Sequence, residues 1–218
     1  MDTTITIIGA GVIGLAIAEE LSAEIPGVFL LERHSSFGQE TSSRNSEVIH
    51  TGIYYPEGSL KAKLCVEGNK LLYDYCRKYE IPHKNCGKLI IASTRGETGI
   101  LENIKKSALK NGVNLEKLEQ EEISVMEPEI SAIEALFSPA TGIIDSHSLM
   151  KRFETNTINN GGNIVYKCEV TGISRISNGY NVSVKNADNT GFSFTTQILV
   201  NCAGLYADRI AEMAGIND

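Results

Sequence analysis

Three closely spaced glycines near the N-terminus are the residues of this sequence whose chemistry is easiest to predict. They lie in the segment Gly9–Gly14, directly after a β-branched apolar run. In such a segment the first glycine allows a tight turn, the second lets the backbone approach a diphosphate, and the third lets a helix pack close to a sheet. Free N–H groups and the positive end of the helix dipole favour phosphates there. The residues predicted to bind a dinucleotide are Gly9, Gly11, Val12, Ile13 and Gly14.

An acidic residue, Glu32, closes the next apolar run eighteen positions after Gly14. A carboxylate at this place can accept hydrogen bonds from the hydroxyls of an adenosine ribose. It also disfavours a 2′-phosphate despite the neighbouring Arg33, which we count among the cofactor-binding candidates. Two alternatives stay open: glycines that serve only the packing of a strand, turn and helix, and Glu32 as an ordinary surface acid.

The elements that position these residues follow from hydrophobic periodicity. A strand at Thr4–Ile8, a helix at Val12–Ser22 and a strand at Val28–Glu32 form one β-α-β unit. The next helix, Leu60–Lys78, is predicted to bury a side with Leu64, Leu71, Leu72 and Tyr75. Further helices are predicted within 98–111, 116–130 and 147–159, and strands at 88–93, 135–138 and 142–145.

The last part of the chain favours FAD over NAD as the dinucleotide. It predicts antiparallel strands at Asn163–Val170, Tyr180–Lys185 and Phe192–Thr195, and then a buried strand at Ile198–Cys202. A nicotinamide domain would continue with further α/β units instead. A parallel sheet with a β-meander is typical of flavin folds of the glutathione-reductase type. We therefore predict an α/β fold: an FAD-binding Rossmann-like domain with a β-meander, plus part of an inserted α+β substrate domain.

Composition narrows the class of protein further. The net charge of −7 gives no reason to expect nucleic acid as a partner. The five cysteines are odd in number and contain no C-x-x-C pair, so we predict neither a disulfide framework nor a metal site. No apolar stretch reaches the roughly 18 residues of a membrane span. We expect a cytoplasmic protein, at most peripheral to the inner membrane, with FAD-binding parts at 1–80 and 146–218 and a substrate-domain part at 81–145.

A longer set of motifs resembles a known family. Residues 41–50 read Thr-Ser-Ser-Arg-Asn-Ser-Glu-Val-Ile-His, and residues 52–55 read Gly-Ile-Tyr-Tyr. Matching blocks follow in order at 59–68, 86–90, 141–145 and 202–206. Together they resemble the D-amino-acid-oxidase-like (DAO) flavoproteins, and among these most closely the L-2-hydroxyglutarate dehydrogenase/oxidase group. Many members have glycine where this chain has Glu47, and members continue well past Asp218, so the resemblance implies a truncated chain.

The resemblance implies FAD as cofactor and oxidation of the C2 alcohol of L-2-hydroxyglutarate to 2-oxoglutarate. The glycine loop and Glu32 would hold the ADP part of FAD, and His50 would lie near the isoalloxazine ring. Val170 would contact the adenine through its backbone, and Ala203 and Gly204 would lie near the pyrophosphate. The residues expected along the pyrophosphate and flavin are Thr41, Ser42, Arg44, Asn45 and Ser46.

The chemistry expected is hydride transfer from C2 of the substrate to flavin N5, while a base takes the hydroxyl proton. His50 is the candidate base because an imidazole titrates near neutral pH. A histidine that only hydrogen-bonds the flavin or its loop, and a covalent flavin link, are the alternatives. A dicarboxylic substrate needs cationic or hydroxyl partners, for which the candidates are Arg44, Tyr54, Tyr55 and Lys61.

Several alternatives stay open at this stage. Lys61 is also compatible with a solvated lysine, and both tyrosines with core packing. A DAO-like amine or amino-acid oxidase, and a non-catalytic FAD-binding fragment, compete with the hydroxy-acid enzyme as functions. The sequence leaves the electron acceptor and the oligomeric state undetermined.

Overall fold

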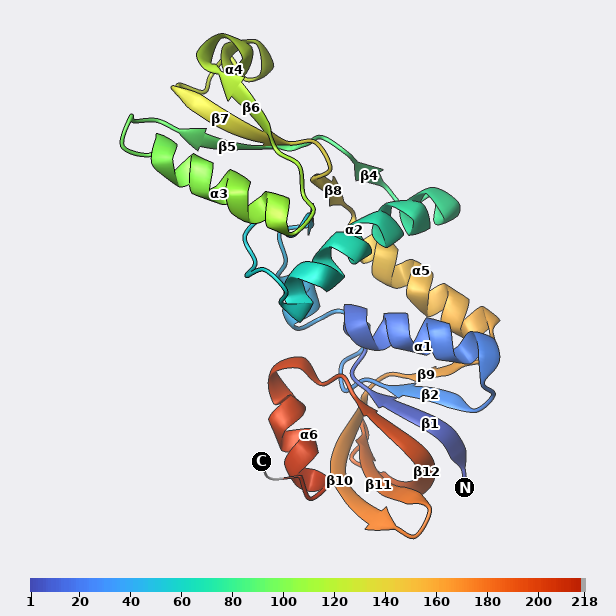
Figure 1. The fold of residues 1–218 in the computed structure, drawn as a ribbon. Coiled ribbons are helices and arrows are strands. Elements are labelled where there is room, and N and C mark those ends of the chain that lie inside the picture. Colours follow the sequence, from blue (N-terminus) through green and yellow to red (C-terminus); the bar gives the residue numbers. More distant parts are fainter. Residues whose placement is uncertain (217–218) are drawn as a thin grey trace. The chain divides into compact units, whose positions relative to one another are not determined.

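The chain divides into two compact units in the computed structural model, which describes residues 1–216. The first unit contains Met1–Asn45 and Ser146–Asp218, and the second contains Ser46–Asp145 (Figure 1). Residues 46–80 therefore pack within the second unit, whereas we had grouped them with the first FAD-binding part. In the part of the chain that the structure describes, no helix is long and apolar enough to cross a membrane.

A six-stranded sheet forms the centre of the first unit (Figure 1). Its strand order is β10-β11-β12-β1-β2-β9. The strands from β12 to β9 run parallel, whereas β10, β11 and β12 form an antiparallel meander. The predicted α/β fold with a parallel sheet and a β-meander is thereby confirmed. The strand bounds are β1 Thr3–Ile8, β2 Val28–Leu31, β9 Asn163–Val165, β10 Cys168–Ile176, β11 Gly179–Asn186 and β12 Gly191–Asn201.

Helices pack on this sheet and complete the core of the first unit. Helices α1 and α5 pack against each other and lie side by side over β1, β2 and β9 (Figure 1). Ile7 and Leu30 of the parallel strands are fully buried, as expected inside a parallel sheet. Ile210 of α6 packs in a core cluster with Val182 and Val184 of β11. The bounds are α1 Val12–Glu24, α5 Ser146–Asn159, η2 Gly204–Tyr206 and α6 Ala207–Met213.

Two strand predictions in the C-terminal part were wrong. The predicted strand Asn163–Val170 is two strands, of which β9 pairs in parallel with β2 and places Leu30 opposite Ile164. The two strands predicted within 192–202 are one strand, β12, in which Thr196 pairs with both Tyr180 and Thr3. Hydrophobic alternation identifies extended chain but carries no information about the partner strand, which explains both errors.

The second unit contains two three-stranded antiparallel sheets. Their strand orders are β3-β8-β4 and β5-β7-β6. Leu101 and Ala108 of α3 pack in a core cluster with Ile53 and Leu136. The bounds are β3 Val48–Ile49, α2 Leu60–Tyr79, β4 His83–Lys84, β5 Lys88–Ala92, α3 Thr98–Lys110, β6 Glu116–Glu119, α4 Gln120–Met126, β7 Glu134–Ser138 and β8 Gly142–Ile144.

The buried side of α2 is not the one that we predicted. Its buried residues are Ala62, Tyr73 and Cys76, whereas Leu64 and Leu71 are 54% and 67% exposed. Alanine, tyrosine and cysteine weigh less than leucine in a search for apolar periodicity, so the pattern selected the wrong side of the helix.

Candidate active site

The glycine loop connects Ile8 of β1 to Val12 of α1. Gly9 has a φ of +105°, which residues with a side chain rarely adopt. A Cβ atom at Gly9 would overlap the backbone of Cys202, and a Cβ atom at Gly14 would overlap the carbonyl oxygen of Gly9. The turn is therefore tight, and the helix packs on it so closely that neither position has room for a side chain.

The start of α1 offers hydrogen-bond donors at this loop. Gly11 is the N-cap residue and has no side chain to occupy the donors. The Val12 N–H donates to Oγ of Ser42 at 3.0 Å. The next N–H groups of the first turn, including that of Ile13, have no acceptor within the helix. Because the helix dipole is also positive at this end, the geometry suits a phosphate group.

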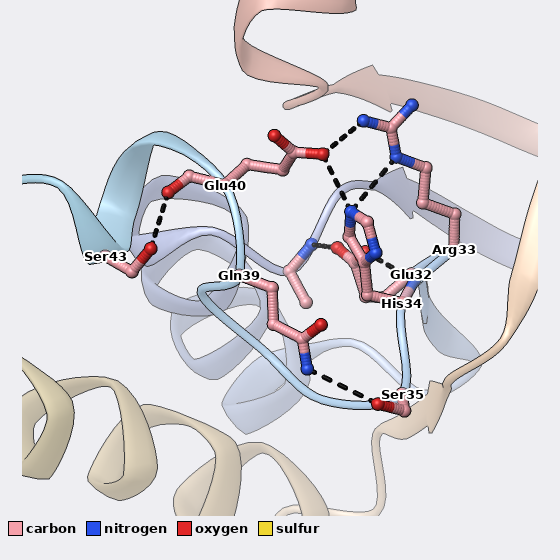
Figure 2. A network of polar contacts seen from close by, with 8 residues as sticks. Glu32, Arg33, His34, Ser35, Gln39, Glu40 and Ser43 are labelled. Carbon is pink, nitrogen blue, oxygen red and sulfur yellow. Dashed lines mark hydrogen bonds and ion pairs between the residues drawn. The ribbon is translucent and has the colours of Figure 1, made fainter.

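Glu32 lies directly after β2 and is only 9% exposed. One carboxylate oxygen accepts a hydrogen bond from the Ala10 N–H at 2.8 Å, and the other accepts one from the His34 N–H at 2.8 Å (Figure 2). The carboxylate thus ties the glycine loop to the segment that follows β2. It stands beside the loop predicted to hold the diphosphate, as a ribose-binding acid should.

Arg33, His34 and Glu40 form a polar network next to Glu32 (Figure 2). The Glu40 carboxylate pairs with the Arg33 guanidinium and with Nε2 of His34, the latter at 2.7 Å. Hydrogen bonds from His34 and Arg33 lower the pKa of the Glu40 carboxyl. The Arg33 guanidinium also lies 4.1 Å above the ring centre of Tyr206, and a hydrogen bond to Tyr206 is the main cause of its raised pKa. Arg33 is therefore fixed beside Glu32 by partners on two sides.

The turn after β12 meets the same region. Gly204 has a φ of +58°, and a Cβ atom at this residue would lie 4.0 Å from Oγ1 of Thr41. Asn45 donates to the carbonyl oxygen of Ser42 at 2.8 Å, and Arg44 is exposed on this loop. The cofactor residues predicted from sequence that the structure places around this loop are Gly9, Gly11, Val12, Gly14, Glu32, Thr41, Ser42 and Gly204.

Val170 joins this group of residues only indirectly. Its side chain is buried in a core cluster that includes Ile8 and Leu31. The register of its strand shifts between Val170 and Gly172, and the Cys168 N–H donates to the carbonyl oxygen of Glu32 at 2.9 Å. The backbone here is thus joined to the end of β2, and its contact with adenine stays a prediction.

These features fit an adenine dinucleotide such as FAD. The loop has glycine at positions 9 and 11, the first turn of α1 has N–H groups without an acceptor inside the helix, and a buried carboxylate lies beside both. Among the described residues 1–216, no group of three or more histidine, cysteine, aspartate or glutamate side chains could hold a metal ion.

The second unit contains a small pocket around His50. It is lined by His50, Thr51, Gly52, Ile53, Tyr54, Tyr55, Lys88 and Thr141. The His50 carbonyl oxygen accepts a hydrogen bond from the Asn69 amide at 3.0 Å, and the same amide donates to Ala140 at 3.0 Å. Partial burial, with the charges of Lys88 and Lys61, lowers the pKa of His50. Its imidazole is therefore neutral, and able to accept a proton, over a wider pH range than usual.

Two lysines lie over the tyrosines of this pocket. The Lys61 ammonium is 4.5 Å from the ring centre of Tyr55, and the Lys88 ammonium is 4.7 Å from that of Tyr54. The structure therefore brings His50, Tyr54 and Tyr55 together, with Lys61 beside them. We had not selected Lys88 from the sequence, although it lies in the family-like block at 86–90.

Comparison with known proteins agrees with an FAD-binding site at the glycine loop. The family model described as "DAO: FAD dependent oxidoreductase" matches residues 4–218. The mitochondrial L-2-hydroxyglutarate dehydrogenase of Arabidopsis thaliana is 53% identical over 66% of this chain and 30% of its own length. The human enzyme of the same name is 39% identical over 97% of this chain and 48% of its own length. The chain spans about half the length, or less, of such curated relatives.

Solved structures share the fold. An L-alpha-glycerophosphate oxidase from Mycoplasma pneumoniae with FAD bound is 32% identical, with a TM-score of 0.89 over 99% of this chain and 58% of that chain. A glycine oxidase from Geobacillus kaustophilus is 21% identical, with a TM-score of 0.85 over 97% of this chain and 58% of that chain. The second likeness concerns the fold alone.

Proposed function

The chain belongs to the DAO family of FAD-dependent oxidoreductases, and from that premise we propose that it oxidises the C2 alcohol of a 2-hydroxy acid. The proposed substrate is L-2-hydroxyglutarate, and the product is 2-oxoglutarate. Relatives that carry the name L-2-hydroxyglutarate dehydrogenase and resemble nearly the whole chain support this choice of substrate.

One observation carries the cofactor part of the proposal: a glycine loop that leads into the start of a helix beside a buried carboxylate. The amide group of Ile13 would hold the pyrophosphate of FAD, joined by that of Val12 in exchange for its bond to Ser42 Oγ, and Glu32 would accept hydrogen bonds from the ribose. Arg33, Thr41, Ser42, Arg44, Asn45, Ser46, Val170, Ala203 and Gly204 would complete the contacts with the cofactor.

We assign the transfer of the hydroxyl proton to His50. When bound, FAD supplies flavin N5 as the acceptor for the hydride from C2. His50 accepts the proton of the substrate hydroxyl, and its lowered pKa keeps the imidazole in the neutral form that this step requires. Asn69 supports His50 by fixing its carbonyl oxygen at 3.0 Å.

The substrate contacts combine cations with hydroxyl groups. Lys61 and Arg44 would pair with carboxylates of the substrate, and Tyr54 and Tyr55 would donate hydrogen bonds.

The test measures first whether the chain retains FAD and then whether the substrate reduces the bound flavin. We expect the purified chain, supplied with FAD, to retain the yellow flavin, and L-2-hydroxyglutarate to bleach it in the absence of oxygen. Glycine and D-alanine should leave the absorbance unchanged. His50→Gln should keep the flavin but slow bleaching by about 10²–10⁴-fold, whereas Lys70→Gln, at an exposed position of α2, should bleach at the normal rate.

Three results would contradict the proposal in different ways. Bleaching by amino acids and not by the hydroxy acid would indicate an amine oxidase. Retention of FAD with no bleaching by either would indicate a non-catalytic FAD-binding chain. A chain that does not retain FAD would overturn the cofactor assignment itself.

A further inference from the structure

Lys88 occupies a fixed position at the pocket of the second unit. It is the first residue of β5, it lines the pocket together with His50, and it is half-buried. Its strand pairs with β7, where Lys88 lies opposite Ser138. The preceding Gly87 N–H donates to the carbonyl oxygen of Thr141 at 2.8 Å. The backbone that carries this ammonium group is therefore held by the sheet on one side and by a turn on the other.

A buried set of hydroxyl groups joins this position to the His50 loop. Ser138 Oγ lies 2.9 Å from Oγ1 of Thr141 and 3.4 Å from Oγ1 of Thr51, the residue next to His50. All three hydroxyl residues are buried. The backbone segments that carry Lys88 and His50 are thus joined by one set of buried hydrogen bonds. These bonds fix the two residues relative to each other.

Within the part of the chain that the structure describes, no acidic side chain pairs with the lysines at this pocket. Among residues 1–216, neither Lys88 nor Lys61 forms an ion pair, and their ammonium groups lie over the rings of Tyr54 and Tyr55, respectively. Glu57, the acid closest in sequence to these tyrosines, pairs with Lys110 at 3.0 Å. Two positive charges therefore act on the pocket, and both contribute to the low pKa of His50 after burial itself.

Uncompensated cations beside a pocket favour an anionic ligand. A lysine over an aromatic ring keeps its ammonium desolvated on one side, which strengthens its attraction for a carboxylate. The arrangement therefore fits a ligand with more negative charge than a simple 2-hydroxy acid carries.

We propose that Lys88 is a specificity-determining residue that binds a second carboxylate of the substrate, so that the pocket selects dicarboxylic over monocarboxylic 2-hydroxy acids. This proposal rests on the proposed function, because that function defines the ligand as a 2-hydroxy acid. It adds a residue that the sequence comparison with the family did not single out.

Binding of non-reacting anions to the FAD-supplied chain tests the proposal. The probes are glutarate, with two carboxylates, and butyrate, with one. Binding is followed by NMR of the histidine ring protons, with the His50 signal assigned by its loss in His50→Gln. The variants are Lys88→Met, Lys88→Arg and, as a control on a nearby strand, the exposed Lys84→Met.

We expect glutarate to bind the unaltered chain more tightly than butyrate and to raise the pKa of His50, because the anion offsets the lysine charges. Lys88→Met should weaken glutarate binding about tenfold or more, reduce the preference over butyrate, and raise the pKa of free His50. Lys88→Arg should keep most of the preference, and Lys84→Met should leave all three measurements unchanged.

An unchanged glutarate preference in Lys88→Met would overturn the proposal, even if the pKa of His50 moves, because Lys88 would then act only as a nearby charge. Absence of glutarate binding in the unaltered chain would overturn it as well. Glutarate binding with the expected Lys88 dependence, but no bleaching of FAD by L-2-hydroxyglutarate, would instead contradict the proposed reaction and leave the carboxylate site intact.

Discussion

The Glu32→Gln substitution tests whether this acid supports the fold as well as the cofactor. The carboxylate accepts hydrogen bonds at 2.8 Å from two backbone N–H groups, those of Ala10 and His34, in a place that is 9% exposed. A glutamine amide keeps one acceptor oxygen but turns an NH2 group toward the other N–H donor. One charge-assisted hydrogen bond is lost, and a buried donor is left facing a donor.

The magnitude follows from these two losses. A hydrogen bond to a charged group contributes about 1.5–3 kcal/mol, and a buried donor without an acceptor costs about 1–3 kcal/mol. The two values overlap because they describe one N–H group, so we expect the free energy of unfolding to fall by about 2–3 kcal/mol. This is a large part of the roughly 5–15 kcal/mol that stabilises a typical domain.

The assay is urea denaturation of the FAD-free chain, followed by circular dichroism. Glu20→Gln is the matched control, because Glu20 is exposed on α1 and undergoes the same chemical change. We expect the control to change the free energy of unfolding by less than about 0.5 kcal/mol. Equal free energies for Glu32→Gln and Glu20→Gln would refute the reasoning, since Glu32 would then serve the cofactor alone.

Two further predictions concern residues with positive φ. Gly9→Ala should lower the thermal midpoint far more than Gly112→Ala. Both glycines have positive φ, but only a Cβ atom at Gly9 would overlap other backbone atoms. Similar midpoints for the two variants would show that the loop can open. Glu47 has a φ of +55°, which strains the backbone of any residue with a Cβ atom. The free energy of unfolding of Glu47→Gly should therefore be about 1 kcal/mol higher than that of Glu47→Ala, because alanine also removes the carboxylate but keeps this strain. Equal values in urea denaturation would exclude that strain.

Sequence reasoning succeeded where the physical signal is local. The spacing of Gly9, Gly11 and Gly14 indicated the turn and the close helix packing because the constraint acts within a few residues of chain. The acid at Glu32 was identifiable because it ends the strand next to that loop.

Lys88 could not be predicted from the sequence, because its proposed role depends on contacts between segments that are far apart in the chain. Its ammonium reaches Tyr54 across more than thirty positions of chain, and nothing in the periodicity of β5 distinguishes it from a solvated lysine. The buried side of α2 failed for a related reason: Tyr73 is buried with its hydroxyl 3.3 Å from the carbonyl oxygen of Ala140, a contact that no helical pattern reveals.

The pairing of β9 with β2 was the hardest feature to predict, and the reason lies in the placement of the second unit. That unit is an insertion between β2 and α5, which otherwise form one β-α-β connection with β9. The insertion leaves at Asn45 and returns at Ser146, and the two side chains hydrogen-bond at 3.1 Å. Because both ends meet at one point, a hundred inserted residues leave the parallel register undisturbed. Sequence reasoning that assumes that consecutive elements pack together cannot recognise a β-α-β unit that contains such an insertion.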